Sequence, residues 1–234
     1  MASFSTSISP RKLRSDLYDS ANSSQPDEST TPLVVSVLAS LLERTMARNE
    51  RIISKCNWVS ASPKFSRTRV FDCYQTPDMT IQSFLERISH YTRAAAPVFV
   101  VAYVYIDRLC QLHPDFRILP RNVHRLLITT TMVASKFVED MNYRNSYFAK
   151  VGGLSTAEMN RLEVDFLFLM GFKLHVNVSV FESYISHLER EVSVGGGYHI
   201  ERTLKFMCRG EITSDEKEKS QITGSSRAIG CGPN

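Results

Sequence analysis

Apolar residues recur at three- and four-residue spacing along most of this chain, and no stretch alternates with the period of two that a strand requires. This spacing predicts helices over residues 32–48, 78–88, 97–112, 122–140, 146–151, 155–171 and 181–188. The pattern therefore predicts an all-α fold of about seven helices.

Several helix ends are marked by residue types that start or stop a helix. Residues 76–78 (TPD) read as a start signal, and the glycines at 152–153 suit a left-handed C-terminal cap. Ser155, with Glu158 three residues later, forms a capping box for the next helix. The helix over 122–140 carries alanine, serine and threonine residues that let other helices approach closely, so we expect it at the centre of the fold.

Composition divides the chain into three parts. Residues 1–31 are rich in serine, threonine, proline and asparagine and are predicted to be a disordered N-terminal tail. Residues 32–192 hold the helical domain, and residues 193–234, which include a triple glycine, are predicted to be a mostly mobile C-terminal tail. Within the domain, residues 54–76 lack a clear period and are locally basic, a pattern interpreted as a solvated connecting loop.

Charge and cysteine content exclude several classes of protein. The formal charge of +4 comes from 28 basic and 24 acidic residues that are mostly interspersed, which argues against a nucleic-acid surface. The longest apolar stretch, residues 94–106, is shorter than the roughly 20 residues that span a bilayer. The five cysteines lack Cys-x-x-Cys spacing, which predicts free thiols in an intracellular protein of the nucleus or cytoplasm.

No catalytic or ligand-binding motif accompanies these features. The sequence contains no Gly-x-Ser-x-Gly, no His-Glu-x-x-His, and no phosphate loop after the triple glycine. We therefore expect no enzymatic activity, no metal site and no cofactor.

Two charged residues stand out within the helical segments. Glu163 has Met159, Phe166 and Leu167 one turn away and no cation among its local neighbours, so its carboxylate needs a donor from elsewhere in the fold. Two interpretations are open for Lys136: a surface pair with the acidic residues at 139–140, or a role shared with Glu163.

Three runs, in this order, resemble the cyclin box: YIDRL at 105–109, ASKF at 134–137 followed by Glu139, and LE at 162–163. The run NSYFAKVGG at 145–153 and the segment at 81–88 resemble the P/U-type cyclins of plants, a branch similar to the yeast phosphate-signalling cyclins. The resemblance covers about residues 32–192. It implies a single five-helix cyclin box with an added N-terminal helix and a C-terminal helix.

The resemblance implies a regulatory subunit that binds and activates a cyclin-dependent kinase, in cell-cycle or phosphate signalling. It places Lys136 and Glu163 at the family's paired kinase-binding positions, and Phe137 and Leu167 on the adjoining apolar contact surface. If both charges face a kinase, the unbound protein should show Glu163 partly exposed beside an apolar patch. The alternatives are a cyclin-fold adaptor of transcription machinery, which predicts a basic face, and a cyclin that binds its kinase without activating it.

Two further features remain open. The run SPRK at 9–12 has the form of a proline-directed phosphorylation site, which makes Ser9 a candidate for modification. The helix at 32–48 either packs on the box or contributes to the kinase interface.

Overall fold

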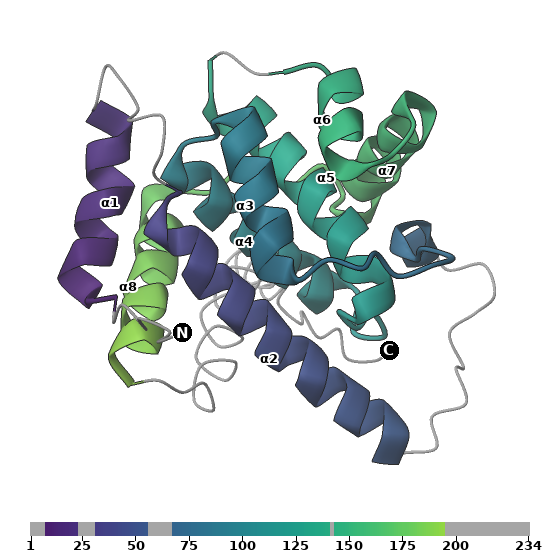
Figure 1. Ribbon diagram of the computed structural model, residues 1–234, viewed down its shortest axis with the longest axis horizontal. Helices are drawn as coiled ribbons and strands as arrows, with labels where there is room; N and C mark the ends of the chain where they lie inside the picture. Colours follow the sequence, from purple (N-terminus) through teal and green to yellow (C-terminus); the bar gives the residue numbers. More distant parts are fainter. Residues whose placement is uncertain (1–7, 23–30, 56–66, 141–142, 195–234) are drawn as a thin grey trace, which may run out of the picture. The chain divides into compact units, whose positions relative to one another are not determined.

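A computed structural model of the chain describes residues 8–22, 31–55, 67–140 and 143–194. Within these ranges the chain forms helices and no strand, which confirms the all-α fold class. The elements (Figure 1) are α1 (Pro10–Asn22), α2 (Leu33–Lys55), the 3₁₀ helix η1 (Arg67–Phe71), α3 (Ile81–Thr92), α4 (Ala96–Leu112), α5 (Pro120–Val138), α6 (Asn145–Gly152), α7 (Thr156–Leu169) and α8 (Val178–Val194).

Helix α5 lies among the others and packs against α3, α4, α6, α7 and η1 (Figure 1). Its buried side chains include the short residues Thr129, Thr130, Thr131, Ala134 and Ser135. Thr129 and Thr130 donate their hydroxyl hydrogens to carbonyl oxygens one turn earlier in α5, at 2.6 and 2.9 Å, whereas the hydroxyl of Thr131 has no partner among the described residues. The central position predicted for the helix at 122–140 is confirmed.

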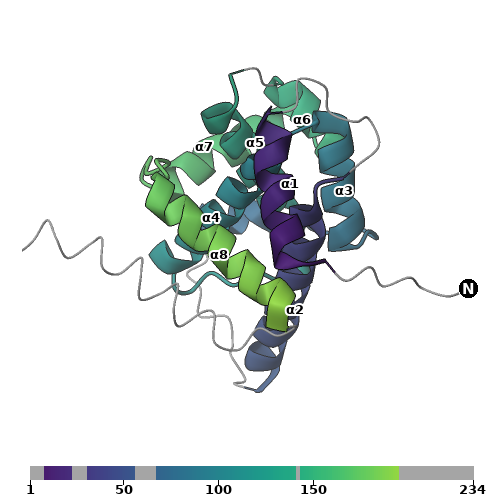
Figure 2. The ribbon, with the colours of Figure 1, turned by 90° about the vertical axis from the view of Figure 1, so that its left-hand side faces the viewer.

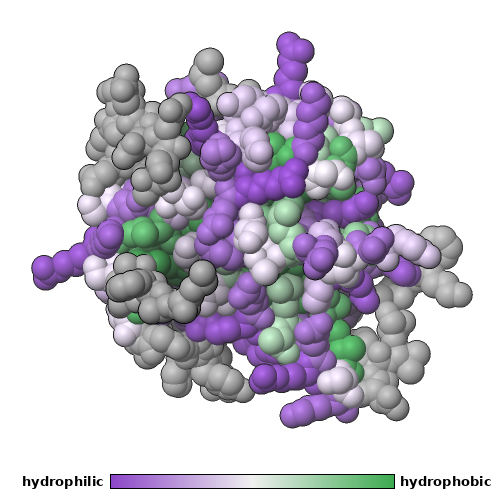
Figure 3. Space-filling model, in the orientation of Figure 1, coloured by the Kyte–Doolittle hydropathy of each residue, from purple (hydrophilic) through white to green (hydrophobic). Residues whose placement is uncertain are grey.

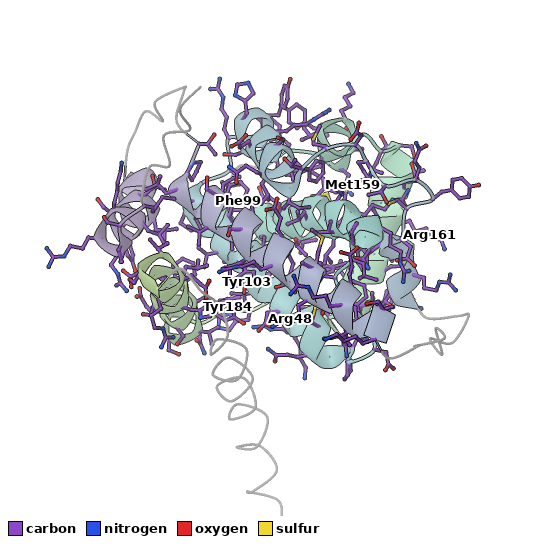
Figure 4. The ribbon with its side chains drawn as sticks, turned by 60° about the horizontal axis from the view of Figure 1, so that its bottom comes forward. Arg48, Phe99, Tyr103, Met159, Arg161 and Tyr184 are labelled. Carbon is purple, nitrogen blue, oxygen red and sulfur yellow. The ribbon has the colours of Figure 1, made fainter. Side chains whose placement is uncertain are left out.

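Polar residues in the second half of α4 hold the chain that follows α7. The buried Tyr105 donates its hydroxyl hydrogen to the carbonyl oxygen of Leu174 at 2.9 Å. Asp107 accepts a hydrogen bond of 2.7 Å from Tyr184 of α8, and Figure 4 shows Tyr184 beside Tyr103, with ring centroids 5.8 Å apart. The YIDRL run therefore holds both the segment that connects α7 to α8 and α8 itself.

The predicted disorder of residues 1–31 is wrong where α1 forms. Leu13 and Leu17, one turn apart, are fully buried, and α1 packs against α8, α4 and α2. Figure 2 shows α1 next to α8. Arg14 donates two hydrogen bonds, of 2.7 and 2.9 Å, to the carboxylate of Glu189, 175 residues further along the chain. The polar composition of residues 1–31 hid the apolar stripe of α1. The helix on which α1 packs most, α8, is remote in sequence, so no local signal pointed to it.

Other boundaries differ from the predicted ones by a few residues. The start signal predicted at 76–78 is wrong, because α3 begins at Ile81 and Thr80 caps it, accepting a hydrogen bond from the backbone of Ser83 at 3.1 Å. Helix α2 continues to Lys55 and packs against α3, α4, α1 and α8. This packing is the first of the two roles considered for the helix at 32–48.

Two of the predicted irregular segments are only partly described. The connecting segment contains η1, while residues 56–66 lie outside the described ranges. The first two residues of the predicted C-terminal tail belong to α8, and residues 195–234 lie outside the described ranges. The predicted mobility of this tail stays a prediction, and so does the assignment of the domain to residues 32–192.

Helix α8 buries a histidine that lacks a hydrogen-bond partner. The side chain of His187 is fully buried, and neither of its ring nitrogens has a partner among the described residues. Burial, and to a smaller extent the charge of Arg190, lowers the pKa of His187 to about 4. The imidazole is therefore neutral at neutral pH, and its unmet hydrogen bonds reduce stability.

Replacing His187 with leucine is expected to raise the free energy of unfolding by about 1–3 kcal/mol at neutral pH, because the unpaired polar ring is removed. In the wild type, the folded-state pKa of about 4 lies below the ordinary histidine value of 6.5, so the unfolded chain binds the proton first as the pH falls. Stability should then decrease by up to about 1.4 kcal/mol per pH unit between these two values.

Urea unfolding of wild type and His187→Leu at neutral pH and near pH 5 tests this expectation, with the exposed His175→Leu as the control. The advantage of the leucine variant should be larger at the lower pH. An advantage that is equal at both pH values would show that His187 does not titrate as described.

Candidate functional site

Lys136, Glu163 and Asn145 form a closed hydrogen-bond network that joins three helices. Lys136, in the last turn of α5, donates to Oε1 of Glu163 in α7 at 2.6 Å and to Oδ1 of Asn145 at 2.5 Å. Asn145, the first residue of α6, donates to Oε2 of Glu163 at 2.6 Å and to Oδ1 of Asn160 at 2.8 Å. The network supplies the remote donor that the sequence required for Glu163.

The end of α5 directs Lys136 toward Glu163 and away from its neighbours in sequence. Glu139, the C-cap of α5, accepts a hydrogen bond from Ser135 at 2.5 Å and another from the backbone N–H of Ala95 at 3.0 Å. Its carboxylate therefore links the end of α5 to the start of α4. The interpretation of Lys136 as merely a surface pair with the acidic residues at 139–140 is wrong, because Lys136 pairs with Glu163.

The turn between α6 and α7 sets which side of α7 faces α5. Gly153 ends α6 in the left-handed conformation, with φ of 69°, and the capping box of Ser155 and Glu158 starts α7, as predicted. The neighbouring Gly152 lies close to α5, since an added Cβ would meet the side chain of Ile128 at 3.0 Å. The tight turn and this close approach bring Glu163 within reach of Lys136.

The charged groups keep part of their hydrogen-bonding capacity. The side chains of Lys136 and Glu163 are 31% and 18% exposed. An ammonium group has three donors, of which two are used here, and a carboxylate has about four acceptor positions, of which two are used. Within the described part of the chain, one donor and two acceptor positions therefore remain for a partner.

Exposed apolar side chains lie on the same two helices as the charged pair. Phe137 and Val138 at the end of α5 are 47% and 41% exposed, and Val164 and Phe168 of α7 are 50% and 55% exposed. Leu167, one turn beyond Glu163, is half-buried. The expectation that Glu163 is partly exposed is confirmed, and the apolar patch beside it stays a prediction. The face in Figure 3 intermixes hydrophilic and apolar residues, so apolar surface is not gathered there into one broad area.

Sequence reasoning missed the two asparagines and the exposed residues of α7. Asn160 precedes Glu163 by three residues, a spacing that places both on one side of α7. Asn145 gave a weaker signal, because only the fold brings the start of α6 to the end of α5. Val164 and Phe168 could have been found from the sequence, because they are apolar residues that lie outside the buried stripe of α7.

Ser9 lies at the start of α1. Its side chain is exposed, and its hydroxyl oxygen accepts a hydrogen bond from the backbone N–H of Lys12 at 3.3 Å. Pro10 follows as the first residue of the helix. Ser9 is therefore an accessible helix cap, and its phosphorylation stays a prediction.

Comparison with known proteins identifies the family to which the chain belongs. The Cyclin family model matches residues 32–174, which include α2 to α7 and both charged residues. The chain belongs to the cyclin family. It is 66% identical over 210 residues to Cyclin-U2-1 of Arabidopsis thaliana, covering 90% of each chain. It is 53% identical over 191 residues to Cyclin-P2-1 of Oryza sativa subsp. japonica, covering 81% of this chain and 86% of the relative.

These relatives confirm the resemblance to plant P/U-type cyclins. Cyclins are regulatory subunits, so family membership assigns this protein a regulatory role and, in general terms, a kinase as its partner. None of the helices in the described ranges combines the length and apolar character needed to cross a membrane.

Substituting Asn145 with alanine is expected to lower the free energy of unfolding by about 1–2 kcal/mol, because Lys136, Asn160 and Glu163 each lose a partner. Urea denaturation measures the change, and Ser146→Ala, at the exposed next position of α6, is the control. Equal stability of both variants would mean that the network does not hold α5, α6 and α7 together.

Proposed function

We propose that this protein binds and activates a cyclin-dependent kinase through Lys136, Glu163 and the adjoining apolar residues Phe137 and Leu167. The observation that carries the proposal is the network itself. It holds two opposite charges in fixed positions, partly exposed, with donor and acceptor positions still available. Such a pair suits the backbone of a partner helix or loop, whose carbonyl oxygens accept from Lys136 and whose N–H groups donate to Glu163.

Pre-assembly of the charged pair favours binding. Asn145 bridges Lys136 and Glu163, so neither long side chain has to be ordered when a partner arrives. Ordering a side chain with many rotamers costs about 0.5–1.5 kcal/mol on binding, and that cost is reduced here. The exposed rings and aliphatic groups beside the pair supply the apolar area that a backbone contact alone lacks.

Activation follows from differential binding to two states of the kinase. A protein kinase transfers phosphate only when an internal lysine–glutamate ion pair is formed, which requires its mobile helix to move inward. A cyclin that binds the inward state more tightly shifts the population toward it. A preference of about 5.5 kcal/mol converts a kinase that is 1% active into one that is 99% active. This protein needs no catalytic group of its own for such an effect.

The process that the kinase serves is either cell-cycle control or phosphate signalling. The similarity to yeast phosphate-signalling cyclins, described above, motivates the second. Kinase activity of the purified pair from phosphate-starved and phosphate-replete cells separates the two. Activity that is independent of phosphate supply would exclude the signalling role.

An exchange of the two charges tests the proposed interface. The double variant Lys136→Glu, Glu163→Lys retains an internal ion pair between α5 and α7 but presents each charge in the other's place. We expect it to fold like the wild type and to bind a cyclin-dependent kinase at least about tenfold more weakly, because donors then face donors across the interface. A pull-down against a panel of cyclin-dependent kinases, with circular dichroism of each variant, measures both properties.

The matched control is Glu50→Lys, Arg51→Glu, which exchanges two exposed charges on α2. It should bind like the wild type. Kinase binding that survives the exchange at positions 136 and 163 in a folded protein would exclude these residues from the interface. Assaying the reconstituted pair for kinase activity then separates activation from binding alone.

A further inference from the structure

A cleft opens on the flank of α7 that carries Arg161. It has a volume of about 640 Å³ and lies between η1, α5 and α7. Arginines Arg67, Arg69, Arg125 and Arg161 line it together with the apolar Val70 and Leu162. Figure 4 shows Arg161 at the outer edge of the molecule, with Met159 closer to the interior. The basic residues of the segment interpreted as a solvated loop thus line a cleft together with arginines from α5 and α7.

The carboxylates at this cleft do not balance its arginines. Asp165 is shared by Arg67 at 3.7 Å and Arg161 at 3.6 Å. Asp72 contacts Arg69 of the cleft at 3.8 Å and also Arg121, which does not line the cleft, at 3.3 Å. With the pair of Arg125 and Glu158, the four arginines that line the cleft meet three carboxylates, an excess of one positive charge.

The guanidinium groups at the mouth of the cleft are loosely held. The contacts of Arg67 and Arg161 with Asp165 exceed the 2.7–2.9 Å of a charge-assisted hydrogen bond. Both arginines are also well exposed, at 52% and 78% of their side chains. Exposed ion pairs of this kind contribute about 0–1 kcal/mol, so stability alone does not account for gathering these charges. Planar guanidinium forks are suited to binding an anion with several oxygens.

We infer that this cleft binds a phosphorylated serine or threonine in a segment of a partner protein. A phosphate monoester carries a charge of about −1.5 to −2 at neutral pH, and both the excess positive charge and the two well-exposed arginines at the mouth of the cleft favour its binding. The volume of about 640 Å³ leaves room for the residues that flank the phosphate. Val70 and Leu162 supply apolar contacts for them, and Phe168, under the guanidinium of Arg67 at 4.9 Å, adds an aromatic surface at the edge. A nucleic acid would need a longer basic surface than this one cleft.

The position of the cleft relates it to the proposed kinase interface without depending on it. At 3.6 residues per turn, Val164 and Phe168 lie on α7 between the side that carries Glu163 and the side that carries Arg161. A partner that covers this exposed face can therefore reach both sites.

Fluorescence anisotropy with the full-length protein tests the inference. The probe is a labelled short peptide with one central phosphoserine among alanine and glycine residues, and its unphosphorylated form is the reference. We expect the phosphorylated peptide to bind at least about tenfold more tightly. Arg67→Gln, Arg161→Gln should reduce its affinity by about tenfold or more, while the control Arg51→Gln, Arg87→Gln, at exposed positions on α2 and α3, should not.

Equal binding of the two peptides, or equal binding by wild type and the Arg67, Arg161 variant, would overturn the inference. Stronger binding of a short single-stranded RNA, or of inorganic phosphate, than of the phosphopeptide would also overturn it, because the ligand would then be of another class. The same variants are carried through the kinase pull-down. Loss of peptide binding with kinase binding retained supports the cleft as a separate site, and a failed kinase interface leaves the peptide result unaffected.

Discussion

The close packing of α4 against α5 is the constraint on which the rest of the fold depends. Short side chains along α5 allow this approach, and two of the threonines among them, Thr129 and Thr130, bond their hydroxyls within the helix. Glu139 then joins the end of α5 to the start of α4, and the second half of α4 holds the chain leading to α8 through Tyr105 and Asp107. Because α5 is held in this way, Lys136 in its last turn has a defined position. The placement of α7 then brings Glu163 within hydrogen-bonding distance of Lys136.

Local signals predicted much of this arrangement. The small residues of α5, the glycine turn after α6 and the capping box of α7 act within a few residues of sequence, and the structure contains all three. What the sequence could not show depends on remote partners. Helix α1 buries Leu13 and Leu17 because it packs on α8, α4 and α2, and Asn145 bridges the charged pair because the start of α6 lies beside the end of α5. The arginines of η1 gain significance only beside Arg125 and Arg161.

Helix α7 joins the two proposed sites in one surface. One flank carries the carboxylate that pairs with Lys136, the other flank borders a cleft with excess positive charge, and apolar side chains are exposed between them. Both proposals rest on selective binding, in which fixed charges discriminate between states or modifications of a partner.

Hydrogen–deuterium exchange of the protein with and without a bound cyclin-dependent kinase tests the central claim most directly. The account predicts slower exchange on binding in the last turn of α5, the first turn of α6 and the exposed half of α7, with α1 and α8 unchanged. Slower exchange confined to α1 and α8, with α7 unaffected, would contradict it, because the kinase would then bind on a surface that contains neither Lys136 nor Glu163.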